Sequence, residues 1–237
     1  MCAMVTFPPL GTTENYALFA NMSVSNTGPT LVSGNVGAGV SITGFSPSGE
    51  GTFVPRGVLV PVGSPVNFMC YADALILDAA LAAEGPAVPL SGNVAGQTLV
   101  AGVYSYNTSA TANGILILDG QNSSSSVWVF QIAGNFTVTT DSSTQVINEA
   151  SACNVFWRIA GWVELHTDEL WIGSLIAQEN ILFDADSDLI GTAISLNGNI
   201  TVTSSNIVPC CEVECPCPVC GSSAPASTGV ATTGFIG

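Results

Sequence analysis

The chain has 237 residues, with no lysine and only two arginines against 17 carboxylates, so its formal net charge is −15. Nucleic acids and anionic membranes are bound mainly through cationic side chains that meet phosphates, so this composition argues against both as partners. Charged residues make up 8% of the chain and hydrophobic residues 47%. The polar surface must therefore be built from Ser, Thr, Asn and Gly, and the length suits one large domain with terminal arms.

The first nine residues, "MCAMVTFPP", predict an extended N-terminal arm that carries Cys2. Pro8 and Pro9 cannot continue a helix or a central strand. The segment lacks the basic and apolar regions of a secretory signal. No apolar run approaches the roughly 20 residues that a transmembrane helix needs. We therefore expect no membrane insertion.

Residues 10–208 form the expected main domain, in which short β-type runs alternate with Gly-Asn or Asn-Gly pairs. Such pairs tolerate the positive φ angles of tight corners. The pattern predicts many short strands joined by sharp turns. Typical segments are "GNVAGQTLVAGVYS", "NGILILDG", "GNFTVTTDSSTQVIN" and "GNITVTSSNIV".

One segment interrupts this pattern and predicts a helix over about residues 65–84. Ser64 is a suitable N-cap with Pro65 in the first turn, and Gly85-Pro86 ends the helix. Apolar residues recur at steps of three and four, which predicts an amphipathic helix. The predicted apolar stripe consists of Phe68, Ala72, Leu75, Ala79 and Ala82.

In the last third of the domain, similar segments begin at Trp162, Ile181 and Ile200, a step of 19 residues. A constant step of this size is typical of a solenoid in which each repeat forms one coil. Three short strands and three corners fit this length. Alternation within a coil predicts Ile200 and Val202 inward, with Thr201 and Thr203 outward.

Several segments also resemble a known family. "LILDGQ", "WVFQI" and "ACNVFW", in this order and after the predicted helix, are similar to the DUF3494 ice-binding (antifreeze) protein family. The resemblance spans about residues 10–208. It implies a mainly β fold, a right-handed discontinuous β-solenoid of triangular section with one long α-helix packed alongside.

The resemblance also implies an ice-binding face, because the family's activity is assigned to a flat solenoid face rich in Thr, Ser and Ala. In this sequence the candidate remnants of such a face are Thr137, Thr139, Thr201 and Thr203. Acidic residues interrupt the expected face, and a cluster of carboxylates repels itself and holds its own hydration. The interrupting side chains, all expected to point outward, are Glu164, His166, Asp168, Asp184, Asp186 and Asp188.

Catalytic and metal-binding motifs are weak in this sequence. His166 is the only histidine and is expected to be a surface residue, and we predict no catalytic residue, no metal site and no cofactor. Asp184, Asp186 and Asp188 resemble the start of a calcium loop, but Leu189 replaces the required Gly, which leaves weak Ca²⁺ binding open. Trp162 and Trp171 are expected to be core residues or, alternatively, part of a contact surface.

The cysteines predict cross-links between chains rather than a metal site. Cys70 and Cys153 are expected to be buried thiols. Prolines stiffen the cluster "CCEVECPCPVC" toward extended conformations, which separate the side chains that a tetrahedral zinc site would need together. A solenoid already has a continuous core, so we expect these cysteines to join neighbouring subunits. The candidates for intersubunit disulfides are Cys2, Cys210, Cys211, Cys215, Cys217 and Cys220.

Residues 209–237 form the expected cysteine-rich connector and C-terminal tail. Its last part, "TGVATTGFI", predicts a strand that adds to a neighbouring subunit. The tail residues expected to make this contact are Thr228, Val230, Thr232, Phe235 and Ile236.

These features together suggest a structural, self-assembling subunit of an extracellular filament, similar to ice-binding-like subunits of bacterial endospore appendages. Its expected partner is itself, joined head to tail, with other appendage or anchor proteins as further partners. One alternative is a secreted ice-binding protein. A third is a cell-surface adhesin or carbohydrate-binding module.

Overall fold

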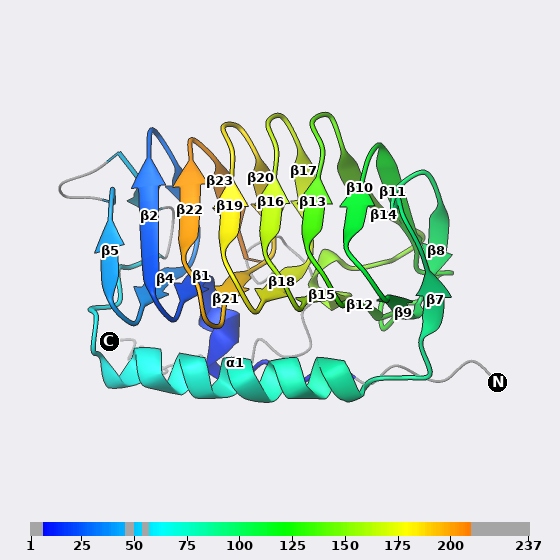
Figure 1. The fold of residues 1–237 in the computed structure, drawn as a ribbon, viewed down its shortest axis with the longest axis horizontal. Helices are drawn as coiled ribbons and strands as arrows, with labels where there is room; N and C mark the ends of the chain where they lie inside the picture. Colours follow the sequence, from blue (N-terminus) through cyan, green and yellow to red (C-terminus); the bar gives the residue numbers. More distant parts are fainter. Residues whose placement is uncertain (1–6, 46–49, 54–56, 210–237) are drawn as a thin grey trace, which may run out of the picture.

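The structure, a computed structural model, describes residues 7–45, 50–53 and 57–209 and consists of three parallel β-sheets with one long helix alongside (Figure 1). The chain passes from one sheet to the next at each corner, so most coils contribute one short strand to each of the sheets A, B and C. The predicted β-solenoid with a flanking helix is confirmed.

Each sheet is a row of strands, named in the order in which they lie side by side. Sheet A contains β4 (Asn35–Ala38), β1 (Tyr16–Ala20), β21 (Ala193–Ser195), β18 (Ser174–Ala177), β15 (Val155–Ile159), β12 (Trp128–Ile132), β9 (Gly102–Tyr106) and β7 (Val88–Leu90). Sheet B contains β10 (Ala110–Ala112), β13 (Phe136–Val138), β16 (Val163–Leu165), β19 (Ile181–Phe183), β22 (Ile200–Thr203), β2 (Ser23–Thr27) and β5 (Ser41–Thr43). Sheet C contains β6 (Thr52–Phe53), β3 (Leu31–Val32), β23 (Asn206–Val208), β20 (Asp188–Ile190), β17 (Leu170–Ile172), β14 (Ser143–Ile147), β11 (Ile115–Asp119) and β8 (Thr98–Val100).

The order of the coils in space differs from their order in the chain. The first coil lies between the second coil and the last one, because β1 pairs with both β4 and β21. Helix α1 (Pro65–Ala83) then carries the chain to the far end, and the remaining coils return from there (Figure 1). Its 19 residues span about 28 Å at 1.5 Å per residue, or about six strand spacings.

The repeat length is less regular than the sequence suggested. Val163 pairs with Ile181, and Ile181 pairs with Ile200, so the steps are 18 and 19 residues. The prediction that Trp162 aligns with Ile181 is therefore wrong by one residue. The extra residue lies in the turn 196–199, which is one residue longer than the turn 178–180 of the preceding coil. The predicted inward Ile200 and Val202 are confirmed, since both are fully buried.

The corners use positive φ angles at two places. Between sheets B and C, aspartates occupy the left-handed region in successive coils, including Asp168 at φ 59° and Asp186 at φ 60°. Short polar side chains tolerate this region better than most residues. Between sheets C and A, Gly191 has a positive φ, and a Cβ there would lie 2.0 Å from the carbonyl oxygen of Gly173.

The Gly-Asn pairs serve two different purposes. The expected positive φ occurs at Gly34 but not at Gly198. A Cβ at Gly198 would lie 2.6 Å from Oδ1 of Asn180, so this glycine is required by a close approach between coils. The same Oδ1 accepts a hydrogen bond from the backbone N–H of Asn199 at 2.8 Å. The asparagines thus join neighbouring corners to one another.

Aromatic rings fill the centre of the solenoid. Phe130 and Trp157 stack with their centroids 3.9 Å apart and an interplanar angle of 8°, and Trp171 lies 5.2 Å from Trp157. Trp171 is fully buried, so the alternative in which it forms a contact surface is wrong. Trp162 is half-buried and directly precedes β16, a central strand of sheet B.

Helix α1 packs with a different face from the one that its apolar spacing predicted. Its predicted bounds are confirmed, and Ser64 caps it through the backbone N–H of Val66. The predicted stripe faces outward, however, and Phe68 is 68% exposed. The buried residues are Asn67, Cys70, Ala74, Leu77 and Leu81. By length and composition alone, α1 is also apolar enough to cross a membrane, with a mean hydropathy of 1.5.

Polar side chains explain this orientation of the helix. Asn67 accepts a hydrogen bond from the Tyr16 hydroxyl at 2.9 Å, and Asp73 accepts from the backbone and hydroxyl of Thr12, each at 2.7 Å. Thr12 belongs to the short 3₁₀ helix η1 (Gly11–Asn15). A buried or half-buried polar group is costly unless it is hydrogen-bonded, so these partners select the face that packs.

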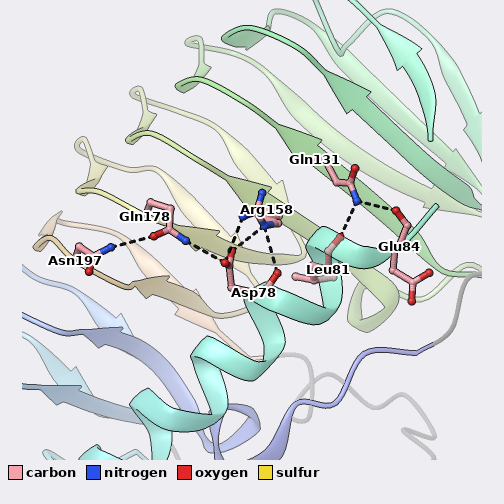
Figure 2. A network of polar contacts seen from close by, with 7 residues as sticks. All are labelled: Asp78, Leu81, Glu84, Gln131, Arg158, Gln178 and Asn197. Atoms are coloured by element: carbon pink, nitrogen blue, oxygen red, sulfur yellow. Dashed lines mark hydrogen bonds and ion pairs between the residues drawn. The ribbon is translucent and has the colours of Figure 1, made fainter. Parts of the chain in front are cut away.

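Asp78 joins the middle of α1 to sheet A (Figure 2). Its carboxylate lies 2.9 Å from Nε of Arg158 on β15 and accepts a hydrogen bond from Gln178 at 3.1 Å. Near the end of the helix, Gln131 on β12 donates to the carbonyl oxygens of Leu81 and Glu84 (Figure 2). Side chains of sheet A therefore hold the helix at two points along its length.

Replacing Asp78 with alanine should lower the free energy of unfolding by about 2–3 kcal/mol, because Arg158 would remain largely buried without its partner. Denaturant unfolding measures this difference. The matched control is Glu179→Ala, which removes an exposed carboxylate from the same region. Equal losses in the two variants would show that the Asp78–Arg158 pair contributes nothing specific.

A column of buried polar side chains follows the corner between sheets B and C. Ser142, Ser187 and Ser205 occupy the same place in their coils, each at 1% exposure or less, and each hydrogen-bonds its own turn. In the coil that contains β16 and β17, Glu169 takes this place and is 4% exposed. Neither oxygen of its carboxyl has a hydrogen-bond partner. Burial, and then the charge of Asp184, raise the pKa of Glu169 to about 10.

Glu169 should make the fold less stable as the pH rises. The unfolded state loses this proton near the ordinary value of 4.5, while the folded state keeps it to about 10. Between these values the folded state binds more protons, so stability falls by about 1.4 kcal/mol per pH unit. Glu169→Gln removes this slope. The melting temperature of this variant should therefore rise relative to that of the parent between pH 5 and pH 9. The exposed Glu149→Gln variant should follow the parent, and parallel curves for Glu169→Gln and the parent would contradict the assignment.

Candidate functional site

Of the three sheets, sheet A is covered by α1 and sheets B and C have outward faces (Figure 1). The strand register aligns the outward side chains of sheet B in rows. The central row reads, from one end to the other, Thr111, Thr137, Glu164, Leu182, Thr201, Ser25 and Thr43.

One end of sheet B carries only uncharged hydroxyl side chains on its outward face. We call this the hydroxyl patch. It lies on three adjacent strands, β22, β2 and β5, and consists of Thr201, Thr203, Ser23, Ser25, Thr27, Ser41 and Thr43. Hydrogen bonds connect neighbouring strands within it, from Ser25 to Thr201 at 3.3 Å and from Ser41 to Ser23 at 2.8 Å. The side chains are therefore ordered across the strands as well as along them.

The structure separates the four threonines that the sequence singled out. Thr201 and Thr203 belong to the hydroxyl patch, whereas Thr137 and Thr139 lie on the other side of β16 and β19. The hydroxyl of Thr139 donates to the carbonyl oxygen of Ala112, so it is used within the fold. The sequence analysis missed the serines and threonines of β2 and β5, because only the topology places them beside β22.

Acidic and bulky residues occupy the middle of sheet B, as the sequence predicted for Glu164, His166 and Asp184. Nδ1 of His166 lies 3.0 Å from Oδ2 of Asp184 in the neighbouring coil. A depression of about 370 Å³ lies on the same sheet, and its lining includes Trp162, Glu164 and Leu182. The face is thus interrupted between its two hydroxyl-bearing ends.

The other predicted acidic residues lie elsewhere. Asp168 and Asp186 form left-handed corners, and Asp188 lies on sheet C, where it accepts hydrogen bonds from the backbone and side chain of Asn206 at 2.8 and 2.9 Å. In the described part of the chain these three carboxylates do not gather into one ligand group, so the calcium loop that their spacing suggested is not formed.

The outward face of sheet C is more apolar than that of sheet B. Ile115, Leu170 and Leu31 are 46%, 40% and 46% exposed, and the register aligns them in one row with Ser143, Asp188 and Asn206. This row mixes large aliphatic, charged and amide side chains, so it lacks the chemical regularity of the hydroxyl patch.

The predicted cross-linking residues lie outside the described residues. These are Cys2, Cys210, Cys211, Cys215, Cys217 and Cys220, together with the tail residues Thr228, Val230, Thr232, Phe235 and Ile236. Cys70 and Cys153 are both buried, as expected. Burial raises the pKa of the Cys70 thiol, and the charge of Asp73 adds to this rise.

The fold and the hydroxyl patch define a class of protein: a discontinuous β-solenoid with a flanking helix and a flat face that bears aligned hydroxyl groups. Comparison with known families matches residues 18–208 to the Ice-binding-like family. The chain belongs to this family.

Individual relatives agree with this assignment. The chain is 30% identical over 210 residues to an ice-binding protein of Nostoc sp. (strain HG1), which covers 86% of this chain and 75% of the relative. Its structure is similar to the crystal structure of an ice binding protein from an Antarctic biological consortium, with a TM-score of 0.82 and 30% identity, over 88% of this chain and 94% of the other. An ice-binding protein from the Antarctic ascomycete Antarctomyces psychrotrophicus has a TM-score of 0.79 and 32% identity, over 86% of this chain and 98% of the other.

Proposed function

We propose that this protein binds ice, acting by adsorption rather than catalysis, and that the hydroxyl patch on sheet B makes the contact. The observation that carries this proposal is the alignment of Thr201, Ser25 and Thr43 across three adjacent parallel strands. The family and its ice-binding members support it. This is the alternative that the sequence analysis placed behind filament assembly.

The physical reason lies in the nature of the ligand. An ice surface is a periodic, flat lattice of water, so a protein face that binds it must also be flat and periodic. Parallel strands repeat about every 4.8 Å, and alternate residues along a strand face the same side. Hydroxyl groups at these positions can hold water in a matching array. The hydrogen bonds from Ser25 to Thr201 and from Ser41 to Ser23 fix them before ice is met.

Charge distribution points to the same part of the molecule. Carboxylates hold their own hydration shells strongly, which opposes contact with a water lattice. The outward side chains of β22, β2 and β5 contain no carboxylate, whereas Glu164 and Asp184 interrupt the middle of sheet B. We therefore place the contact on the hydroxyl patch and not on the whole of sheet B.

A bulky residue in the hydroxyl patch should abolish most of the activity. We expect Ser25→Tyr to lower thermal hysteresis about ten-fold at equal protein concentration. The tyrosine would prevent flush contact while pointing outward from the fold. Thermal hysteresis and ice-crystal shaping measure the effect.

The matched control is Gln145→Tyr, which places the same side chain at an exposed position on sheet C. This variant should keep the parental activity. Equal activity in the parent and in Ser25→Tyr would exclude the hydroxyl patch. An inactive parent protein would exclude ice binding altogether.

As a second candidate function, we propose head-to-tail assembly into a filament outside the cell. One observation favours it: end strands such as β5 of sheet B and β8 of sheet C each have one hydrogen-bonded neighbouring strand among the described residues. Unpaired strand edges are able to accept another chain. The six cysteines near the two ends of the sequence provide groups for cross-linking such a contact.

Assembly predicts covalent ladders. In non-reducing electrophoresis of the oxidised protein we expect a regular series of multimers that collapses to one band after thiol reduction, and filaments in electron micrographs. Replacing the cysteines at 210, 211, 215, 217 and 220 with serine should remove the ladder. A monomer under oxidising conditions would eliminate this candidate and leave the ice-binding proposal unaffected.

A further inference from the structure

Three potential metal ligands meet in the middle of sheet B. Glu164 lies on β16 and His166 directly follows it, so their side chains point to the same face. Asp184 follows β19 and stands beside His166, because Leu165 pairs with Phe183. One ligand atom from each of Glu164, His166 and Asp184 lies within 4.8 Å of the others. In the described part of the chain this is the only such group of three or more ligand residues.

Among the described residues, no arginine lies near the cluster to balance its charge. Arg158 is the one arginine in the described part of the chain, and it is paired with Asp78 against α1 on sheet A. The chain as a whole has a formal net charge of −15. Two carboxylates beside one imidazole, in a field of this sign, favour a bound cation.

The second observation is a buried carboxyl in the same coil as Glu164 and His166. Glu169 is 4% exposed, and both of its oxygens lack a hydrogen-bond partner. It lies close enough to Asp184 for that charge to act on it. Neighbouring coils have a small, hydrogen-bonded serine in this place, at Ser142 and Ser187. Such a carboxyl is costly to bury, and a cation bound at Asp184 would offset the negative charge that acts on it.

We propose that Glu164, His166 and Asp184 bind a divalent transition-metal ion. An imidazole with carboxylates suits Zn²⁺ and similar ions, whereas Ca²⁺ takes oxygen ligands only. Donor atoms of a tetrahedral zinc site lie about 3.3 Å apart, given bonds of about 2.0–2.2 Å. All three side chains are half-buried on the surface, so small rotations close the distance. This site is independent of the proposed ice binding.

The single histidine of the chain provides a direct test. Protein labelled with ¹⁵N at histidine is titrated with Zn²⁺ alone, and the ring nitrogens of His166 are followed by NMR. We expect them to shift and to saturate with one equivalent at this site. This signal reports on His166 even if cysteines elsewhere also take up zinc. Ring resonances that stay unchanged in excess Zn²⁺ would overturn the proposal.

Variants identify the remaining ligands. Glu164→Gln and Asp184→Asn should each weaken the response of His166 by about ten-fold or more, since even the loss of an outer partner costs about that much. The matched control is Asp186→Asn, which removes one carboxylate from the same turn and should leave the affinity unchanged. Thermal unfolding of each variant without metal checks that the fold is kept.

Two further outcomes decide the assignment. If Asp186→Asn weakens zinc binding as much as Asp184→Asn does, general charge attraction explains the response and the site is excluded. If Ca²⁺ shifts the ring nitrogens as strongly as Zn²⁺ does, the assignment to a transition metal is wrong. A response to Zn²⁺ but not to Ca²⁺ supports the proposal.

Discussion

The pairing of the first coil with the last coil is the contact on which the rest of the structure depends. β1 pairs with β21, and β2 pairs with β22 through residues such as Val24 and Ile200. This contact joins the N-terminal coils to the main stack. It requires α1 to carry the chain to the far end, from which the remaining coils return. It also places the hydroxyls of β2 and β5 beside those of β22. The proposed ice-contacting surface exists only because distant segments share one sheet.

The sequence predicted the helix and strands themselves better than it predicted which elements pack or pair with one another. Strand alternation, the bounds of α1 and the inward Ile200 and Val202 follow from local patterns, which depend on residues close together in the chain. The packed face of α1 did not follow from its apolar spacing. The helix is apolar almost all round, so the polar partners of Asn67 and Asp78 decide its orientation, and these lie far away in sequence.

The candidate site was predictable only in part. Thr201 and Thr203 were recognisable from the alternation within their coil, but the contribution of β2 and β5 depends on a discontinuous topology. The one-residue difference between successive coils likewise hid the alignment of Val163 with Ile181, and so the position of Glu164 relative to Leu182. The sequence showed that charged residues interrupt the face. The contact between His166 and Asp184 could not be predicted, because it depends on which coils lie side by side.

The interior position of the last coil has a consequence for how the protein folds. Strands β21, β22 and β23 are flanked on both sides, by the preceding coil and by the first one. The N-terminal coils therefore have no permanent partner until the last residues of the domain emerge from the ribosome. Contacts of such long sequence separation slow folding. During synthesis, the serine- and threonine-rich strands at the start of the chain must wait with an open edge, which exposes them to pairing with other chains.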